Sequence, residues 1–66
     1  MVYIVYLTKR NKKYYPLFSV LYENWSVENE PHHYCHDEEI AQNLCRKLTG
    51  IFPEYNASYY ILKEIF

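Results

Sequence analysis

The first third of the chain consists of two long apolar runs separated by a short polar connection. Residues 2–8 (VYIVYLT) are rich in β-branched and aromatic side chains, which is typical of a strand buried on both faces. Five polar residues, 9–13, precede a second β-rich run at 14–22, and a connection of that length predicts an antiparallel hairpin. Pro16 has no backbone N–H and cannot donate a hydrogen bond to a neighbouring strand. The second strand must therefore be an edge, or pair only on the side that Pro16 leaves free.

The middle of the chain predicts a long connection followed by one helix. Residues 23–36 show no sustained period and contain Pro31, so we expect an irregular loop. A helix is expected over residues 38–49, because Asp37 is a good N-cap and Gly50 fits the position after the last turn. The apolar residues of this segment form one stripe, which is Ile40, Ala41, Leu44, Cys45 and Leu48. The helix therefore buries one face only.

The last segment, residues 55–66, is apolar at nearly every position from 59 to 62 and predicts a third strand. The helix would return this strand antiparallel to the first strand, on its free side. The expected fold is α+β with ββαβ topology: a three-stranded antiparallel sheet of order 2-1-3, with one helix packed on one face. All 66 residues are expected to form a single small domain.

One helix covers one face of such a sheet, although the strands are apolar on both faces. Pairing Ile4 with Phe18 divides the strand residues into two sets. The set expected to face the helix is Val2, Ile4, Tyr6, Phe18 and Val20. The set expected to face away is Tyr3, Val5, Leu7, Leu17 and Leu21. If this second set is exposed, it forms an apolar patch of the kind that marks an interaction site. Alternatively, the long loop with Trp25 folds over the patch and covers it.

The high aromatic content of the chain favours a protein that binds a partner through an exposed surface. Aromatic residues make up 20% of the chain, with nine Tyr, and Tyr and Trp are enriched at the centres of interfaces. A chain this short buries only about 60% of its unfolded surface, so stacked sheet faces or paired edges of the third strand would stabilise a homodimer. We expect a homodimer that also binds a larger protein. The expected contact residues are Tyr3, Val5, Leu7, Leu17, Leu21, Trp25, Tyr59, Tyr60, Ile61 and Leu62.

The net charge and the cysteine content indicate which class of partner and which cellular compartment to expect. The net charge is −1, which is unlike the basic field of most nucleic-acid-binding domains. Two cysteines, no signal-peptide pattern and no apolar run of about 20 residues predict a cytoplasmic protein with reduced thiols and no membrane contact.

Metal-capable side chains gather in and after the long loop. Zinc would take a set such as His32, Cys35, His36 and Cys45, but the spacing matches no finger-type pair and Cys45 lies on the apolar stripe. Cys35 as a nucleophile would need His33 or His36 as its base, and adjacent residues rarely face one another. The single Gly excludes a glycine-rich phosphate loop. We predict no metal, no cofactor and no enzymatic activity.

The alternative function is nucleic-acid binding by the first hairpin, which combines cations with rings that can stack on bases. The residues concerned are Lys9, Arg10, Lys12, Lys13, Tyr14 and Tyr15. Six of the eight acidic residues lie in residues 23–39, which makes the molecule dipolar rather than basic.

The order of these patterns resembles that of many small proteins encoded by bacteriophages and mobile elements of low-GC bacteria. The resemblance lies in the first hairpin, the acid-capped helix DEEIAQNLCRKL at 37–48 and the closing strand YYILKEIF at 59–66. It implies a ββαβ accessory protein that binds and inhibits a host enzyme or an anti-phage defence protein. Such a protein acts in the host cytoplasm by covering a surface of its larger partner.

Overall fold

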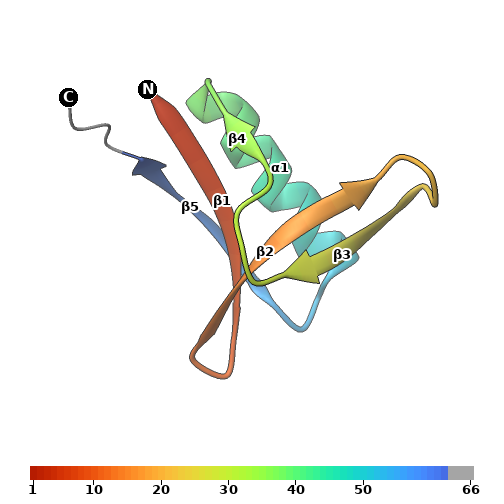
Figure 1. Ribbon diagram of the computed structural model, residues 1–66. Helices are drawn as coiled ribbons and strands as arrows, with labels where there is room; N and C mark the ends of the chain where they lie inside the picture. The colour runs from red at the N-terminus through yellow and green to blue at the C-terminus, as the bar shows by residue number, and fades with distance from the viewer. Residues whose placement is uncertain (63–66) are drawn as a thin grey trace.

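The computed structural model describes residues 1–62 and shows an α+β fold with five strands and one helix (Figure 1). The elements are β1 (Val2–Lys9), β2 (Lys12–Ser19), β3 (Asn24–Glu28), β4 (Tyr34–Cys35), α1 (Glu38–Ile51) and β5 (Asn56–Leu62). The predicted α+β class and the helix packed against an antiparallel sheet are confirmed. The expected three strands are too few, and the expected end of the last strand, at 63–66, lies outside the described residues.

β1 is the central strand of the sheet. On one side it pairs with β5 from Val2↔Leu62 to Thr8↔Asn56. On the other side it pairs first with β4 and then with β2, and β3 pairs with the far side of β2. The expected placement of the first strand between the second and the last is therefore confirmed, and two short strands are added to it.

The connection between β1 and β2 is shorter than expected. The strands extend through Lys9 and Lys12, which face each other, so the turn is the two residues Arg10 and Asn11. Their φ angles are 52° and 65°, as in the type I′ turn that matches the twist of a hairpin. The expected five-residue connection was wrong, because residues 9, 12 and 13 belong to the ladder.

This tighter turn also overturns the expected register. Leu7 pairs with Tyr14, and extending this register would place Leu17, not Phe18, across from Ile4. β2 leaves β1 after Tyr14, and Ile4 pairs with Tyr34 of β4. A slip of one residue exchanges the two faces of a strand.

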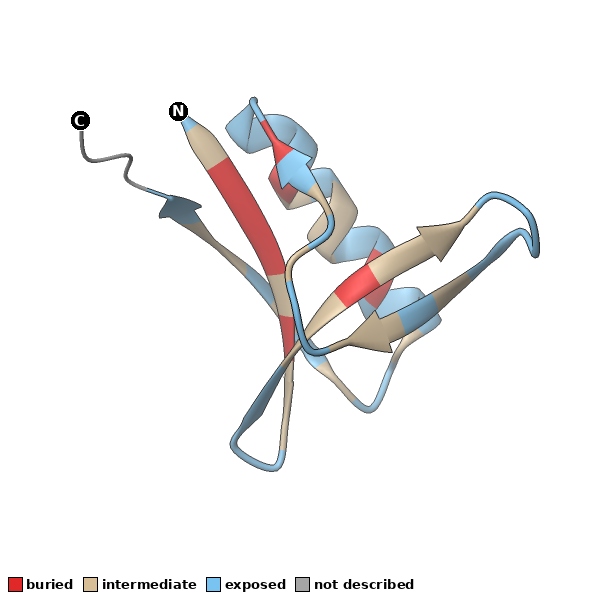
Figure 2. Cartoon of the chain, viewed as in Figure 1, coloured by how far each residue is buried: buried red, intermediate tan, exposed pale blue. Residues whose placement is uncertain are grey.

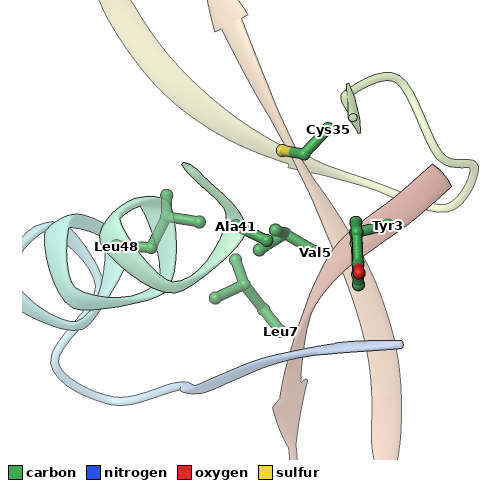
Figure 3. Packing of buried hydrophobic residues seen from close by; sticks show 6 residues of the cluster. All are labelled: Tyr3, Val5, Leu7, Cys35, Ala41 and Leu48. Atoms are coloured by element: carbon green, nitrogen blue, oxygen red, sulfur yellow. The ribbon is translucent and has the colours of Figure 1, made fainter. Parts of the chain in front are cut away.

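The two sheet faces are also the reverse of the expected ones on β1, because α1 packs on the side that was expected to face away. Tyr3, Val5 and Leu7 point toward α1 and are buried with Cys35, Ala41 and Leu48. Figure 3 shows these six side chains converging between the helix and the strands, and Figure 2 shows the longest stretch of buried residues on β1. Of the set expected to face the helix, Phe18 packs on Trp25, a ring that lies against this core. Val20 lies in an exposed turn.

Pro16 lies where β2 pairs on one side only. Its partner is Val27 of β3, whereas pairing with β1 has already ended at Tyr14. This agrees with the expectation that a strand containing Pro16 pairs only on the side that the missing N–H leaves free. On the open side, the N–H of Phe18 donates to His33 Nε2 at 3.1 Å. The segment that leads into β4 therefore satisfies a donor that β1 leaves free.

The segment predicted as an irregular loop contains β3 and β4. The β3 sequence, NWSVE, alternates polar and apolar residues, and Trp25 and Val27 pack against the core. β4 has only two residues, and it exists because the edge of β1 is vacant beside Tyr3 and Ile4. The expectation of an unstructured connection was therefore wrong.

The helix begins as predicted and ends later. The Asp37 side chain accepts from the N–H of Glu39 at 2.9 Å, which confirms the N-cap. α1 continues through Gly50 to Ile51 and ends at Phe52, where the following proline disfavours helical geometry. Of the predicted stripe, Ala41 and Leu48 are buried and Leu44 and Cys45 pack against the core, but Ile40 is exposed.

Candidate functional site

The face of the sheet that turns away from α1 groups four tyrosines, of which Tyr34 is exposed and Tyr6, Tyr15 and Tyr60 are half-buried. Ile4 on the same face is buried. Because Tyr3, Val5 and Leu7 point to the helix, Ile4 and Tyr6 point the opposite way. Residues directly opposite in a ladder share a face, which extends this side onto the neighbouring strands. We call it the tyrosine face, and it comprises Val2, Ile4, Tyr6, Lys13, Tyr15, Leu17, Tyr34, Tyr60 and Leu62.

Lys13 holds two rings of the tyrosine face together. The Tyr6 and Tyr60 ring centroids are 5.7 Å apart. The Lys13 Nζ lies 4.8 Å from the centroid of Tyr6 and 5.4 Å from that of Tyr60, within the range of cation–π attraction. The ammonium group therefore covers part of both rings and fixes their positions.

The hydroxyl groups of the tyrosine face lie within electrostatic reach of one another. Burial raises the pKa of Tyr60, and interactions with Tyr15, Tyr34 and Tyr6 raise it further. Tyr60 is thus a neutral hydroxyl at physiological pH and can both donate and accept a hydrogen bond. Tyr34 is 52% exposed. The face combines apolar rings with polar tips, as protein interfaces commonly do.

Three of the predicted contact residues are in the core instead. Tyr3, Val5 and Leu7 are buried beneath α1 and cannot reach a partner in the folded chain. The prediction that their side of β1 forms the interaction surface was wrong, because α1 packs on this side of the strand. The surface it described lies on the other side of the same strand.

Two further predicted contact residues connect structural elements. The Tyr59 hydroxyl donates to Glu38 Oε1 at 2.9 Å and accepts from Gln42 Nε2 at 3.2 Å, which attaches β5 to α1. Trp25 packs on Phe18 and His33, with centroids at 5.2 and 5.4 Å. The loop with Trp25 thus packs on the helix side of the sheet and leaves the tyrosine face open.

The remaining predicted contact residues are on the surface. Leu17, Tyr60 and Leu62 belong to the tyrosine face, Ile61 is exposed on β5, and Leu21 is exposed in the turn after β2. Sequence reasoning missed Tyr6 and Tyr34 as surface candidates. Tyr6 was assigned to the helix side, and only the packing of α1 shows that it lies on the other side, whereas Tyr34 depends on a pairing that no local pattern signals.

The cations of the first hairpin line one surface pocket, but they are divided between the two sides of the ladder. Lys9 binds Glu54 with its Nζ 2.8 Å from Oε2, and this hydrogen bond and charge raise the pKa of Lys9 and lower that of Glu54. Lys12 lies opposite Lys9 on the helix side, and Lys13 lies on the tyrosine face. Arg10 is exposed in the turn. The rings also separate, because Tyr14 packs on Tyr55 at 5.6 Å whereas Tyr15 lies on the tyrosine face.

The metal-capable residues serve other roles. Cys35 is buried, and Cys45 packs against the same core. Burial raises the pKa of both thiols, with a further contribution of Cys35 to Cys45, so both are weak nucleophiles. His32 and His36 are exposed. Within residues 1–62, no group of three or more His, Cys, Asp or Glu side chains is placed to hold a metal ion.

Residues 1–62 contain no helix that is long and apolar enough to cross a membrane. Comparison of the chain with protein-family models, with curated proteins and with solved structures gives no match. The functional interpretation therefore depends on the geometry of the chain itself.

Proposed function

We propose that this protein is a small non-enzymatic binding module that covers a surface of a larger protein with its tyrosine face. The observation that carries this proposal is the convergence of Tyr6, Tyr15, Tyr34 and Tyr60 on the helix-free side of the sheet. Tyrosine supplies a large contact area at a small cost in side-chain entropy. The Lys13 contacts reduce that cost further, because two of the rings are already fixed.

Occlusion of a larger partner is compatible with inhibition. The resemblance to small phage and mobile-element proteins supports a host enzyme or an anti-phage defence protein as the partner, met in the host cytoplasm. A sheet face lined with tyrosine rings suits this mode of action, since it blocks access to a surface without supplying chemistry of its own.

Nucleic-acid binding by the first hairpin is the alternative, and two contacts weigh against it. Base stacking needs free ring faces, whereas the Tyr14 ring packs on Tyr55 with centroids 5.6 Å apart. Lys9 is paired with Glu54, which reduces the charge available to phosphates. Salt dependence separates the two functions, because phosphate binding weakens steeply with salt and a tyrosine-rich protein interface does not.

The experiment is a comparison of variants in affinity capture from a lysate of cells in which the chain is naturally made. Tyr34→Ser and Tyr60→Ser alter the tyrosine face, and Ile40→Ser on the outer side of α1 is the matched control. A protein retained by the wild type and by Ile40→Ser, and lost with both tyrosine variants, supports the proposal. Loss of each contact should weaken binding about tenfold or more.

Two results would contradict the proposal. One is a bound protein that both tyrosine variants retain as well as the wild type does. The other is binding to oligonucleotides at physiological salt that disappears when Lys13 is replaced by Gln. Circular dichroism of each variant excludes loss of the fold as the cause.

A further inference from the structure

A surface pocket lies at the tip of the hairpin formed by β1 and β2. Figure 1 shows this turn at one end of the molecule, and Asn56 at the start of β5 pairs with Thr8 beside it. The pocket has a volume of about 420 Å³ and combines the four cations of the hairpin with neutral hydrogen-bonding side chains. We call it the hairpin pocket, and its lining residues are Thr8, Lys9, Arg10, Asn11, Lys12, Lys13 and Asn56. Within residues 1–62 no acidic side chain lines it, so its chemistry suits an anion.

Three of the four cations of the hairpin pocket remain available to a ligand. Lys9 Nζ lies 2.8 Å from Glu54 Oε2, and this ion pair neutralises one cation. Among residues 1–62, Arg10, Lys12 and Lys13 take part in no ion pair. Like charges at one site repel one another, and an anion placed among them is attracted to all of them. A bound anion would therefore offset a repulsion that the described part of the chain leaves uncompensated.

The hairpin pocket adjoins the tyrosine face through Lys13. The Lys13 Nζ lies over the rings of Tyr6 and Tyr60, and the same side chain lines the pocket. An ammonium group has three N–H donors, so its contact with the rings leaves donors for a further acceptor. A protein that covers the tyrosine face would therefore meet the pocket with the adjoining part of its own surface.

The acidic residues beside the hairpin pocket favour a protein carboxylate over a nucleic-acid strand. A strand carries a phosphate at every nucleotide and continues beyond a pocket of this size. Along β2, Tyr15 lies two residues beyond Lys13 and is paired with Glu28, and Glu54 is held beside Lys9. These two carboxylates would repel the phosphates that follow. A single Asp or Glu side chain needs no such continuation.

We propose that the hairpin pocket binds an Asp or Glu side chain of the larger protein, next to the area that the tyrosine face covers. This inference rests on the proposed binding function and adds a second contact and the chemistry of the partner. Arg10 offers a planar guanidinium group that can donate two parallel hydrogen bonds to a carboxylate, and Lys12 adds an ammonium group. Charged contacts of this kind orient a complex and speed its association.

Carbodiimide crosslinking tests this inference, because the reagent joins a lysine amine to a carboxylate only where the two are in direct contact. The protein is treated in a lysate of cells in which the chain is naturally made, and the linked peptides are identified by mass spectrometry. The expected product links Lys12 or Lys13 to an Asp or Glu of another protein. The internal link between Lys9 and Glu54, whose charged atoms are 2.8 Å apart, shows that the reagent has reacted. Lys47 on α1 is the control lysine, which should form no link to that protein.

A double variant measures what the hairpin pocket contributes to binding. Arg10→Gln combined with Lys12→Gln removes two charges from the pocket and leaves the tyrosine face unchanged. Arg46→Gln combined with Lys47→Gln removes the same two kinds of charge from α1 and is the matched control. The affinity for the protein captured by the wild type should fall about tenfold in the first variant and stay unchanged in the control. The melting temperature of the first variant should not change, because Arg10 and Lys12 are exposed.

The outcomes separate this inference from the proposed function. A captured protein that both tyrosine variants lose, and that the pocket variant binds as tightly as the wild type does, overturns the inference and leaves the proposed function standing. A captured protein that only the pocket variant loses supports the pocket contact and overturns the proposed function.

Three further results would overturn the inference. One is the internal link between Lys9 and Glu54 without any link from Lys12 or Lys13 to another protein. The second is a link from these two lysines only to a second copy of this chain, or a link from Lys47 to the partner in equal yield. The third is binding to oligonucleotides at physiological salt that the pocket variant loses.

Discussion

His33 completes the hydrogen bonding of β2 where that strand separates from β1. Its Nε2 accepts the N–H of Phe18 at 3.1 Å, and its ring packs on Trp25. Only the neutral ring can accept this bond, since both nitrogens of the charged ring are donors. Burial lowers the pKa of His33, and the charge of His32 lowers it further. The fold therefore depends on the protonation state of one side chain.

This dependence predicts a loss of stability in mild acid. The folded-state pKa of His33 lies below its ordinary value of 6.5, so the unfolded chain binds the proton first as the pH falls. The contribution of His33 is complete above pH 6.5 and is lost as the pH falls through the folded-state pKa. Urea unfolding at pH 7 and pH 5 should show this decrease. In His33→Asn the decrease should be smaller, whereas His36→Asn, at an exposed position, should behave as the wild type does. An equal decrease in wild type and His33→Asn would disprove this role.

The residue types near His33 were visible in the sequence, but their roles were not. Cys35 and Cys45 were considered as zinc ligands with His32 and His36, and His33 as a base for Cys35, although spacing alone does not say which way a side chain points. The structure places both thiols against the core and the imidazole in a backbone hydrogen bond. Tertiary contacts, which no local pattern encodes, assigned these roles.

At the scale of elements, the side of the sheet on which α1 packs decides which face is open. The first, second and last strands, the helix start at Asp37 and the central position of β1 follow from hydrophobic pattern and capping and were predictable, whereas β3 and β4 were not. The face assignment was not predictable either, because β1 is apolar on both sides. The positive φ angles of Arg10 and Asn11 are unfavourable for most residues, so composition gave only a weak signal for a tight turn.

The same turn offers a test at this scale. Replacing Arg10 and Asn11 by the pair Asn-Gly supplies residues that adopt positive φ readily, and should raise the free energy of unfolding by about 1 kcal/mol. Arg10→Ala is the control, because alanine gains nothing at a φ of 52°. Urea unfolding measures both. Destabilisation by Asn-Gly would show that the turn is not of this type.

The outer edge of β5 is the second element with a consequence for function. Within residues 1–62, no strand pairs with this edge, and Ile61 and Leu62 are 47 and 38% exposed there. Unpaired edges are templates for pairing with another chain. We propose that two copies join their β5 edges into one continuous sheet. Stacking through Tyr3, Val5 and Leu7 is excluded, since α1 covers them.

Sedimentation equilibrium checks this dimer. At about 100 μM, a dimer with a micromolar dissociation constant would be mostly assembled, and its unfolding temperature should rise with concentration. Ile61→Lys places a charge at the edge and should yield monomers, whereas Ile40→Lys should not. A wild-type chain that stays monomeric at this concentration would leave the edge pairing without support.

At the scale of the whole molecule, the charges are separated along the chain. The cations of the first hairpin lie at residues 9–13, and six of the eight acidic residues lie at 23–39. A dipolar molecule orients in the field of a charged partner before contact.

The tyrosine face as the partner surface is the central claim, and tyrosine nitration tests it most directly. Tetranitromethane should nitrate Tyr34 in the free protein, because this ring is 52% exposed. In the complex with the protein captured by the wild type, we expect Tyr34 to be protected and its nitrated peptide to decrease about tenfold or more. Nitration of Tyr34 at the same rate in the free and the bound protein would contradict the account.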